Sequence, residues 1–193
     1  MVLALVGAGC GHRTEKRSPA PPRPELFGPG ARYRPAAFGR AVERARPVRG
    51  LGCTRANHTR FLAHLEIFVD GRVVLIPAGI GIAPPQVRRG AFVVSGRCDY
   101  PLRTREPTGL VEIVHGTLPT LGDLFAVWGQ PLRSRRVLSF RGPVAAFVGS
   151  RRMAGDPRGI ELRPHSVVTL EVGRHVRPHF PYVFPPGLPT VRP

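Results

Sequence analysis

The stretch His64-Leu-Glu-Ile-Phe-Val-Asp-Gly-Arg-Val-Val-Leu-Ile-Pro77 carries the clearest structural signal in the chain. Its Asp70-Gly71 pair stands between two runs of apolar and β-branched residues. This pattern predicts a β-hairpin with a type I′ turn, because both central positions of that turn require positive φ. Strand alternation would place odd-numbered residues such as Leu65 on one face and even-numbered residues such as His64 on the other. We expect the second strand to end or bulge by Pro77.

Downstream segments predict four more strands and one helix. The strands are expected at residues 91–95, 110–114, 144–148 and 167–172. Leu121, Leu124, Phe125 and Trp128 recur at helical spacing, with Thr120 and Asp123 placed as a capping box and Gly129 as the stop signal. We expect Trp128 to lie in the core. This order predicts an α+β fold that is mostly β, a mixed sheet with one short helix packed on it in a β-grasp-like arrangement.

Composition divides the 193 residues into four parts with room for one ordinary domain. Residues 1–10 are interpreted as the remnant of a lipoprotein signal. Residues 11–50 are rich in Pro and Arg and are expected to be a disordered tether, because they contain too few apolar residues for a core. Residues 51–175 form the expected β-rich domain, and residues 176–193 a Pro-rich extended tail.

The cysteines predict the compartment. The apolar run from Met1 ends in small residues and Cys10, which resembles the end of a lipoprotein signal peptide whose cysteine is acylated. We therefore expect export to the cell envelope, either lipid-anchored or periplasmic or extracellular. Cys53 and Cys98 then remain as a pair and favour a disulfide in an oxidising compartment. Two reduced core thiols or two metal ligands are the alternatives.

The formal charge of +17 comes almost entirely from arginine, since Lys16 is the only lysine. The excess of Arg, Pro, Gly and Ala is typical of a GC-rich genome, and the arginines are dispersed. We expect no nucleic-acid partner, because stacking aromatics and a known binding module are lacking. Polyanion binding through the dispersed arginines is an alternative function.

The sequence contains no familiar catalytic signature, neither a nucleophile elbow nor a P-loop nor a zinc-protease motif, and we expect no enzyme. A transition-metal site could draw on His58, His64, Glu112 and His115. The competing interpretation of His64 is a packed histidine with a satisfied hydrogen bond. Glu112 would need a partner such as Arg103 or Arg105 if its sheet face is covered, but we expect that face to be solvated.

The chain from Cys53 to about Gly187 resembles a family of uncharacterised exported bacterial and archaeal proteins. The matching residues are 63–71, 76–82, Cys98 with Tyr100, Thr108-Gly109, 120–125, 128–132, Asp156-Pro157, Tyr182 and Phe184-Pro185. Relatives of this kind carry histidines before the hairpin and a His-Thr-His-Asp run followed by a strand histidine, which implies a bound transition metal. The resemblance covers about two thirds of the chain.

This chain departs from that pattern at the implied metal ligands. Arg103-Thr104-Arg105-Glu106 stands in place of His-Thr-His-Asp, and Glu112 replaces the strand histidine. Arginine stays protonated and is not an ordinary metal ligand, so we expect the implied site to be lost and Arg103 and Arg105 to be candidates for an anion site. The sequence thus predicts a non-catalytic, lipid-anchored domain that binds a protein or envelope partner and meets the membrane only through its lipid. A metal-binding module with a degenerate histidine site is the alternative.

Overall fold

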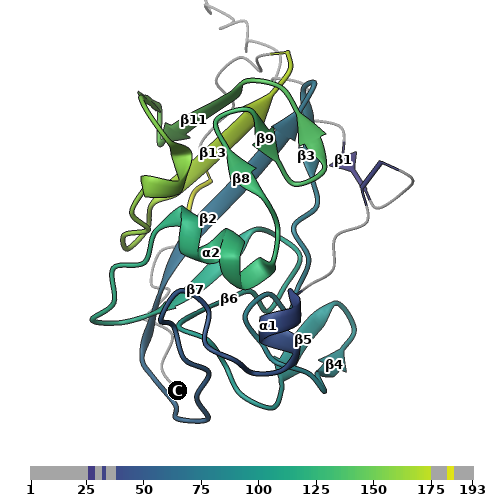
Figure 1. Ribbon diagram of the computed structural model, residues 1–193, viewed down its shortest axis with the longest axis vertical. Coiled ribbons are helices and arrows are strands. Elements are labelled where there is room, and N and C mark those ends of the chain that lie inside the picture. Colours follow the sequence, from purple (N-terminus) through teal and green to yellow (C-terminus); the bar gives the residue numbers. More distant parts are fainter. Residues whose placement is uncertain (1–25, 29–31, 34–37, 175–181, 185–193) are drawn as a thin grey trace, which may run out of the picture.

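The computed structural model describes residues 26–28, 32–33, 38–174 and 182–184. The predicted signal with Cys10, most of the predicted tether and most of the predicted tail lie outside these residues. Within the described part, strands and short loops predominate (Figure 1). The fold is therefore mostly β, as the sequence predicts.

The largest element is a mixed sheet of eight strands, six of which run in the order β1-β3-β2-β13-β11-β12. A second branch pairs β7 with β2 and β6 with β7. The strands are β1 (Leu26–Phe27), β2 (Arg60–Val69), β3 (Arg72–Val74), β6 (Leu102–Arg103), β7 (Leu110–Val114), β11 (Val144–Val148), β12 (Arg151–Met153) and β13 (Val167–Val172). Strand β2 pairs in parallel with β13 and β1 with β3, while the other pairs are antiparallel.

The β2–β3 hairpin forms at the position that the sequence predicts. Asp70 and Gly71 have φ of 50° and 82°, as a type I′ turn requires. The β2 strand is longer than the quoted stretch and starts at Arg60. In the order β3-β2-β13-β11, the two central strands are β2 and β13, which come first and last along the chain and run parallel. This is the β-grasp-like arrangement expected from the sequence.

The main helix, α2 (Leu121–Trp128), lies in the connection between β7 and β11. The Thr120 hydroxyl accepts from the Asp123 N–H, the Asp123 carboxylate accepts from the Thr120 N–H, and Gly129 ends the helix at φ 73°. Trp128 is fully buried, so the predicted cap, stop and core residue are all confirmed. The remaining elements are α1 (Arg40–Glu43), the 3-10 turn η1 (Pro157–Gly159), a small sheet of β8 (Leu132–Arg133), β9 (Arg136–Val137) and β10 (Phe140–Arg141), and the hairpin of β4 (Val87–Arg89) and β5 (Phe92–Ser95).

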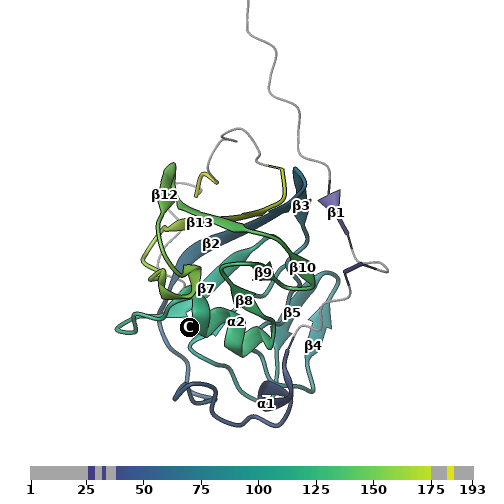
Figure 2. The same cartoon turned by 45° about the horizontal axis from the view of Figure 1, so that its top comes forward.

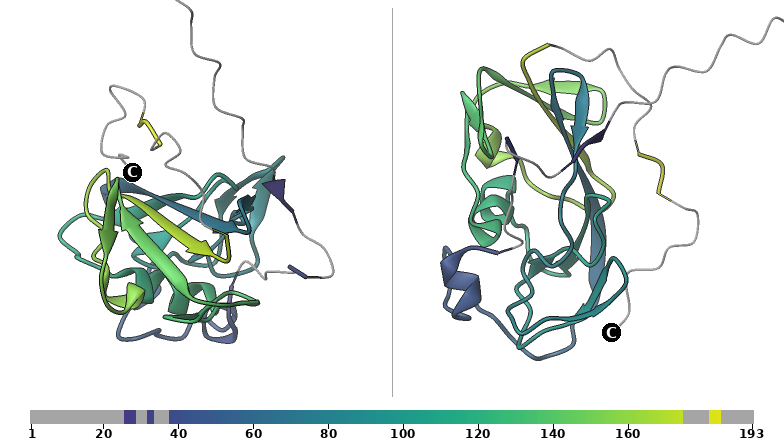
Figure 3. Two further views of the ribbon diagram at one scale, coloured as in Figure 1. Left: turned by 90° about the horizontal axis from the view of Figure 1, so that it is seen from above. Right: turned by 90° about the vertical axis from the view of Figure 1, so that its right-hand side faces the viewer.

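The two faces of the large sheet are covered by different segments of the chain. Figure 3 shows α2 on one side of the sheet and residues 182–184 on the other. Leu65 and Ile67 of β2 point into the core with Trp128, and His64 and Glu66 point to the opposite face. Figure 2 shows the β4–β5 hairpin projecting beside this body.

Part of the segment assigned to the tether contributes to the core. Phe27, Tyr33, Val42 and Val48 are all buried there, and the Tyr33 hydroxyl donates to the Leu75 carbonyl oxygen at 2.6 Å. The described residues before position 51 therefore do not behave as a disordered tether. A segment too poor in apolar residues to build its own core can still place single aromatic and aliphatic side chains in a core made by other elements.

A pair of glycine substitutions tests this upstream packing. A Cβ on Gly129 would meet the Gly39 Cα at 2.4 Å, whereas a Cβ on Gly116 would meet nothing within 4 Å. Gly129 and Gly116 have φ of 73° and 80°, so alanine costs roughly 1 to 2 kcal/mol of left-handed strain at either position. Gly129→Ala should therefore lower the free energy of unfolding clearly more than Gly116→Ala in urea titrations. Equal losses would show that residue 39 does not pack on the end of α2.

Candidate functional site: the polar face of the central sheet

The side of the sheet opposite α2 gathers most of the buried charge, and we call it the polar face. Strand alternation puts Arg60 and His64 of β2 on this face, and the register places Glu112 of β7 opposite Leu62 and beside Arg103 of β6. Arg60, His64, Arg103 and Glu112 are each no more than 9% exposed. The expectation of a solvated face around Glu112 is therefore wrong, because neighbouring side chains and loops cover the carboxylate.

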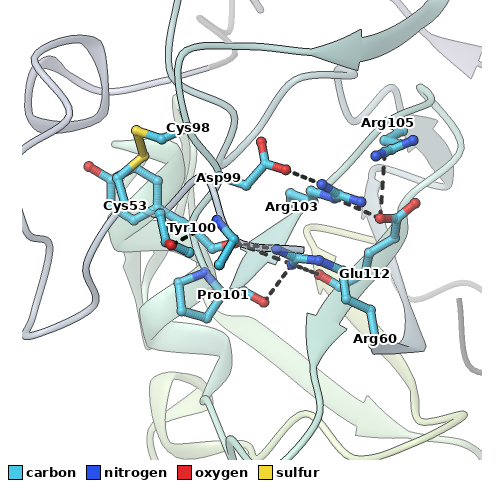
Figure 4. Close-up of polar contacts among 11 residues, drawn as sticks. Cys53, Arg60, Cys98, Asp99, Tyr100, Pro101, Arg103, Arg105 and Glu112 are labelled. Atoms are coloured by element: carbon cyan, nitrogen blue, oxygen red, sulfur yellow. Dashed lines mark hydrogen bonds and ion pairs between the residues drawn. A yellow bond between two sulfur atoms is a disulfide. The ribbon is translucent and has the colours of Figure 1, made fainter. Parts of the chain in front are cut away.

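Arg103 and Glu112 form an arginine–carboxylate cluster with Asp99 and Arg105, and Arg60 lies next to it (Figure 4). Arg103 lies at its centre and donates from Nε to Glu112 Oε2 at 2.7 Å, while its Nη1 pairs with Asp99. Arg105 Nε lies 3.7 Å from the same Glu112 oxygen. Two guanidinium groups, those of Arg103 and Arg105, thus share the carboxylates of Asp99 and Glu112, and Glu112 has the two partners that the sequence proposed for a covered face.

Arg60 lies beneath this cluster and is compensated mainly by backbone carbonyls. Its Nη1 donates to the carbonyl oxygens of Tyr100 at 3.2 Å and Pro101 at 3.0 Å. Burial and the neighbouring Arg103 guanidinium lower the pKa of Arg60 to about 10, so that Arg60 remains a cation at neutral pH. A buried cation that spans two carbonyls ties β2 to the loop before β6.

The disulfide fixes that loop. Cys53 and Cys98 are bonded, which confirms the predicted pairing and excludes both alternatives for these cysteines. The adjacent residues Thr54 and Asp99 exchange two backbone hydrogen bonds of 3.0 and 2.8 Å. The disulfide and this bridge together place the Asp99 carboxylate beside Arg103.

The predicted metal set does not assemble. His115 is exposed at the end of β7, where its ring contacts Phe61 edge-on, and His58 is only half-buried in the loop before β2. His64 and Glu112 lie on the polar face, but Glu112 is engaged by the two arginines. Across the described ranges, no three His, Cys, Asp or Glu side chains come close enough to hold a metal ion.

The predicted anion site is only partly available. Arg103 is engaged by two carboxylates, which leaves only Arg105 of the two predicted anion ligands substantially exposed.

His64 is only partly satisfied by its surroundings. Its Nε2 lies 3.0 Å from the Thr108 carbonyl oxygen, and because a carbonyl can only accept, Nε2 must carry the proton. Nδ1 is then an unprotonated acceptor that has no hydrogen-bond partner and lies 3.9 Å from Glu66 Oε1. Burial lowers the pKa of His64 below its ordinary value, although Glu66 and the Thr108 carbonyl oppose the shift. The ring is therefore neutral at neutral pH.

A cavity of about 260 Å³ is lined by His64 and Tyr182, among other residues. The Tyr182 ring stacks on the His64 ring at 3.9 Å between centroids and 7° between planes. Phe184 contacts the His165 ring at 4.9 Å between centroids, with the two planes tilted by 56°. The described residues of the tail thus lie against the polar face, whereas the tail histidines His175 and His179 lie outside the described residues.

Three residues of the polar face were not predicted from the sequence, namely Arg60, Asp99 and Tyr182. The position of Arg60 could have been predicted, because Arg60 is four residues before His64 and strand alternation puts both on the same face. Asp99 stands next to the paired Cys98 and four residues before Arg103, which hints at proximity without fixing it. Nothing in the local sequence indicates that Tyr182 stacks on a residue more than a hundred positions earlier.

Comparison of this chain with known protein families, curated proteins and solved structures finds no match. The resemblance to a family of exported proteins therefore stays a prediction. The structure does show how the three positions of the implied metal ligands are arranged: Arg103 and Arg105 both approach the carboxylate of Glu112. At these positions the chain holds ion pairs instead of imidazoles.

The central ion pair can be tested by removing one charge. Glu112→Gln leaves the buried Arg103 with one carboxylate fewer and should lower the free energy of unfolding by about 3 kcal/mol. Glu161→Gln, which breaks the exposed pair with Arg163, should have little effect. The double variant Arg103→Met/Glu112→Leu should recover part of the loss, because the two most buried charges of the cluster are removed together, while Asp99 and Arg105, which each lose a partner, are more exposed. A Glu112→Gln protein as stable as the parent in urea titrations would contradict the assigned role of the pair.

The buried His64 makes stability depend on pH. The unfolded chain binds the His64 proton more tightly than the folded chain, so acidification through and below about pH 6.5 should lower the free energy of unfolding, and this contribution should level off above that pH. His64→Gln keeps an N–H donor for Thr108 but cannot titrate, and should flatten the slope between pH 7.5 and 5. His115→Gln, at an exposed histidine, should keep the parent slope. Parallel slopes for parent and His64→Gln would refute the argument.

Proposed function

We propose that this chain acts outside the cytoplasm as a non-catalytic binding domain, held at the membrane through Cys10, that binds a protein or another component of the cell envelope. The observation that carries the proposal is the Cys53–Cys98 disulfide, because protein disulfides form and persist in oxidising compartments. Within the described residues, no helix is long and apolar enough to cross a bilayer. Membrane attachment in this proposal therefore depends on the lipid at Cys10, which lies outside the described residues.

The arrangement of the polar face supports binding in preference to catalysis. Its charged groups contact one another, and arginine is neither a general base nor an ordinary metal ligand at neutral pH. The disulfide closes a loop across 45 residues, which stabilises a small domain by about 4 kcal/mol in the chain-entropy model. A rigid scaffold of this kind presents its partner-binding groups on loops and hairpins at the surface.

The proposal is tested by the intact mass of the mature protein purified from its native host. We expect a lipid-sized increment on Cys10, a gain of two protons on reduction, and no stoichiometric metal in the same sample. Cys10→Ser should lose the lipid increment but keep the two-proton gain, which separates the anchor from the disulfide. Cys53→Ser should lose the two-proton gain. An unprocessed chain with free thiols would overturn the compartment, and stoichiometric metal would favour the metal-binding alternative.

A further inference from the structure

The β4–β5 hairpin carries only positive charge at the surface of the described chain. Its sequence from Gln86 to Arg97 contains three arginines and no acidic residue. Arg88, Arg89 and Arg97 are all exposed. Arg88 donates to the Ala78 carbonyl oxygen and the Gln86 side-chain oxygen, which are both neutral, so these contacts leave its positive charge uncompensated.

The same hairpin exposes apolar side chains beside these charges. Val87 is 54% exposed and Phe92 51%, although side chains of this type are usually buried in soluble domains. Arg89 and Phe92 are directly paired across the hairpin and so share its outer face. Val93 points the other way and is fully buried with Ala78 and Ile82. One side of the hairpin is therefore anchored to the body, and the other presents the Phe92 ring next to the Arg89 guanidinium group. Arg88 is paired with Val93 and starts from the anchored side, but its side chain is exposed.

We propose that the β4–β5 hairpin contacts the surface of a membrane that contains anionic phospholipids, with Phe92 and Val87 entering the headgroup region, Arg89 binding lipid phosphates beside them, and the exposed Arg88 adding its charge from the edge of the hairpin. Mixed aromatic and arginine surfaces suit the membrane interface, which is apolar on one side and anionic on the other. A single two-stranded hairpin offers far fewer residues than the roughly 20 to 30 on each side of an ordinary protein interface. The chain's net charge of +17 draws it toward an anionic surface as a whole.

This contact goes beyond the proposed anchor, because it needs no lipid on Cys10. It also differs from the expectation that the membrane is met only through the lipid. A second hairpin, β11–β12, provides an internal comparison, since it carries the exposed pair Arg151 and Arg152. Figure 1 places β4 and β5 at the opposite end of the molecule from β11.

The test uses the full chain with Cys10→Ser and a tryptophan reporter at Phe92. The natural Trp128 is fully buried and supplies a constant background. With vesicles of equimolar phosphatidylcholine and phosphatidylglycerol, Phe92→Trp should shift its emission to the blue and be quenched by brominated acyl chains. It should not respond to phosphatidylcholine alone. The same reporter at Leu118, an exposed apolar residue between β7 and α2, should respond to neither vesicle.

Charge removal completes the test. In the Phe92→Trp background, Arg88→Gln/Arg89→Gln should weaken the vesicle response roughly 30-fold at low ionic strength, from about 1 kcal/mol for each arginine near an anionic surface. Arg151→Gln/Arg152→Gln removes the same charge from the other hairpin and should have a much smaller effect. Vesicle binding without any change at position 92 would assign binding to another part of the chain and overturn the proposal. Equal losses from the two arginine pairs would do the same, since binding would then follow net charge alone.

Discussion

Strand β2 is hydrogen-bonded along both edges, to β13 over six residues on one edge and to β7 and then β3 on the other. Its register with these neighbours decides which side chains of the whole sheet share a face, because a slip of one residue would exchange the two faces. In the observed register, Leu65 and Ile67 lie in the same core as the buried residues of α2, and Arg60 and His64 join the polar face. Both the core and the candidate site therefore depend on this one strand.

The polar face shows how a small β domain can bury charge. Each buried guanidinium group has either a carboxylate or backbone carbonyls within reach, and the disulfide holds the loop that carries Asp99. Such a cluster is not by itself a source of stability, since the desolvation of its members offsets much of their attraction. The cluster instead favours one relative position of these segments, because β2, β6, β7 and the disulfide loop must all be in register before every charge has a partner.

The two ends of the polar face differ in character. Around Arg103 the charges are paired, whereas around His64 an imidazole nitrogen is buried without a hydrogen-bond partner beside a small cavity. The Tyr182 ring covers that imidazole, so a residue near the C-terminus takes part in the environment of one near the start of the domain. Exposed charged and apolar side chains also lie away from this face, on the β4–β5 hairpin, where Val93 is buried and Phe92 and Arg89 are exposed.

The sequence by itself determined the hairpin at Asp70-Gly71, the strands β7, β11 and β13, and the capped helix α2, because each depends on turn chemistry or on periodicity between near neighbours. It also paired Cys53 with Cys98 from the number of cysteines and the expected compartment. Only the tertiary structure decided that the face of Glu112 is covered, that Phe27 and Tyr33 reach the core, and that Asp99 and Arg60 complete the cluster. These outcomes depend on contacts between residues far apart in the chain, and local pattern carries no information about which distant segment will cover a given face.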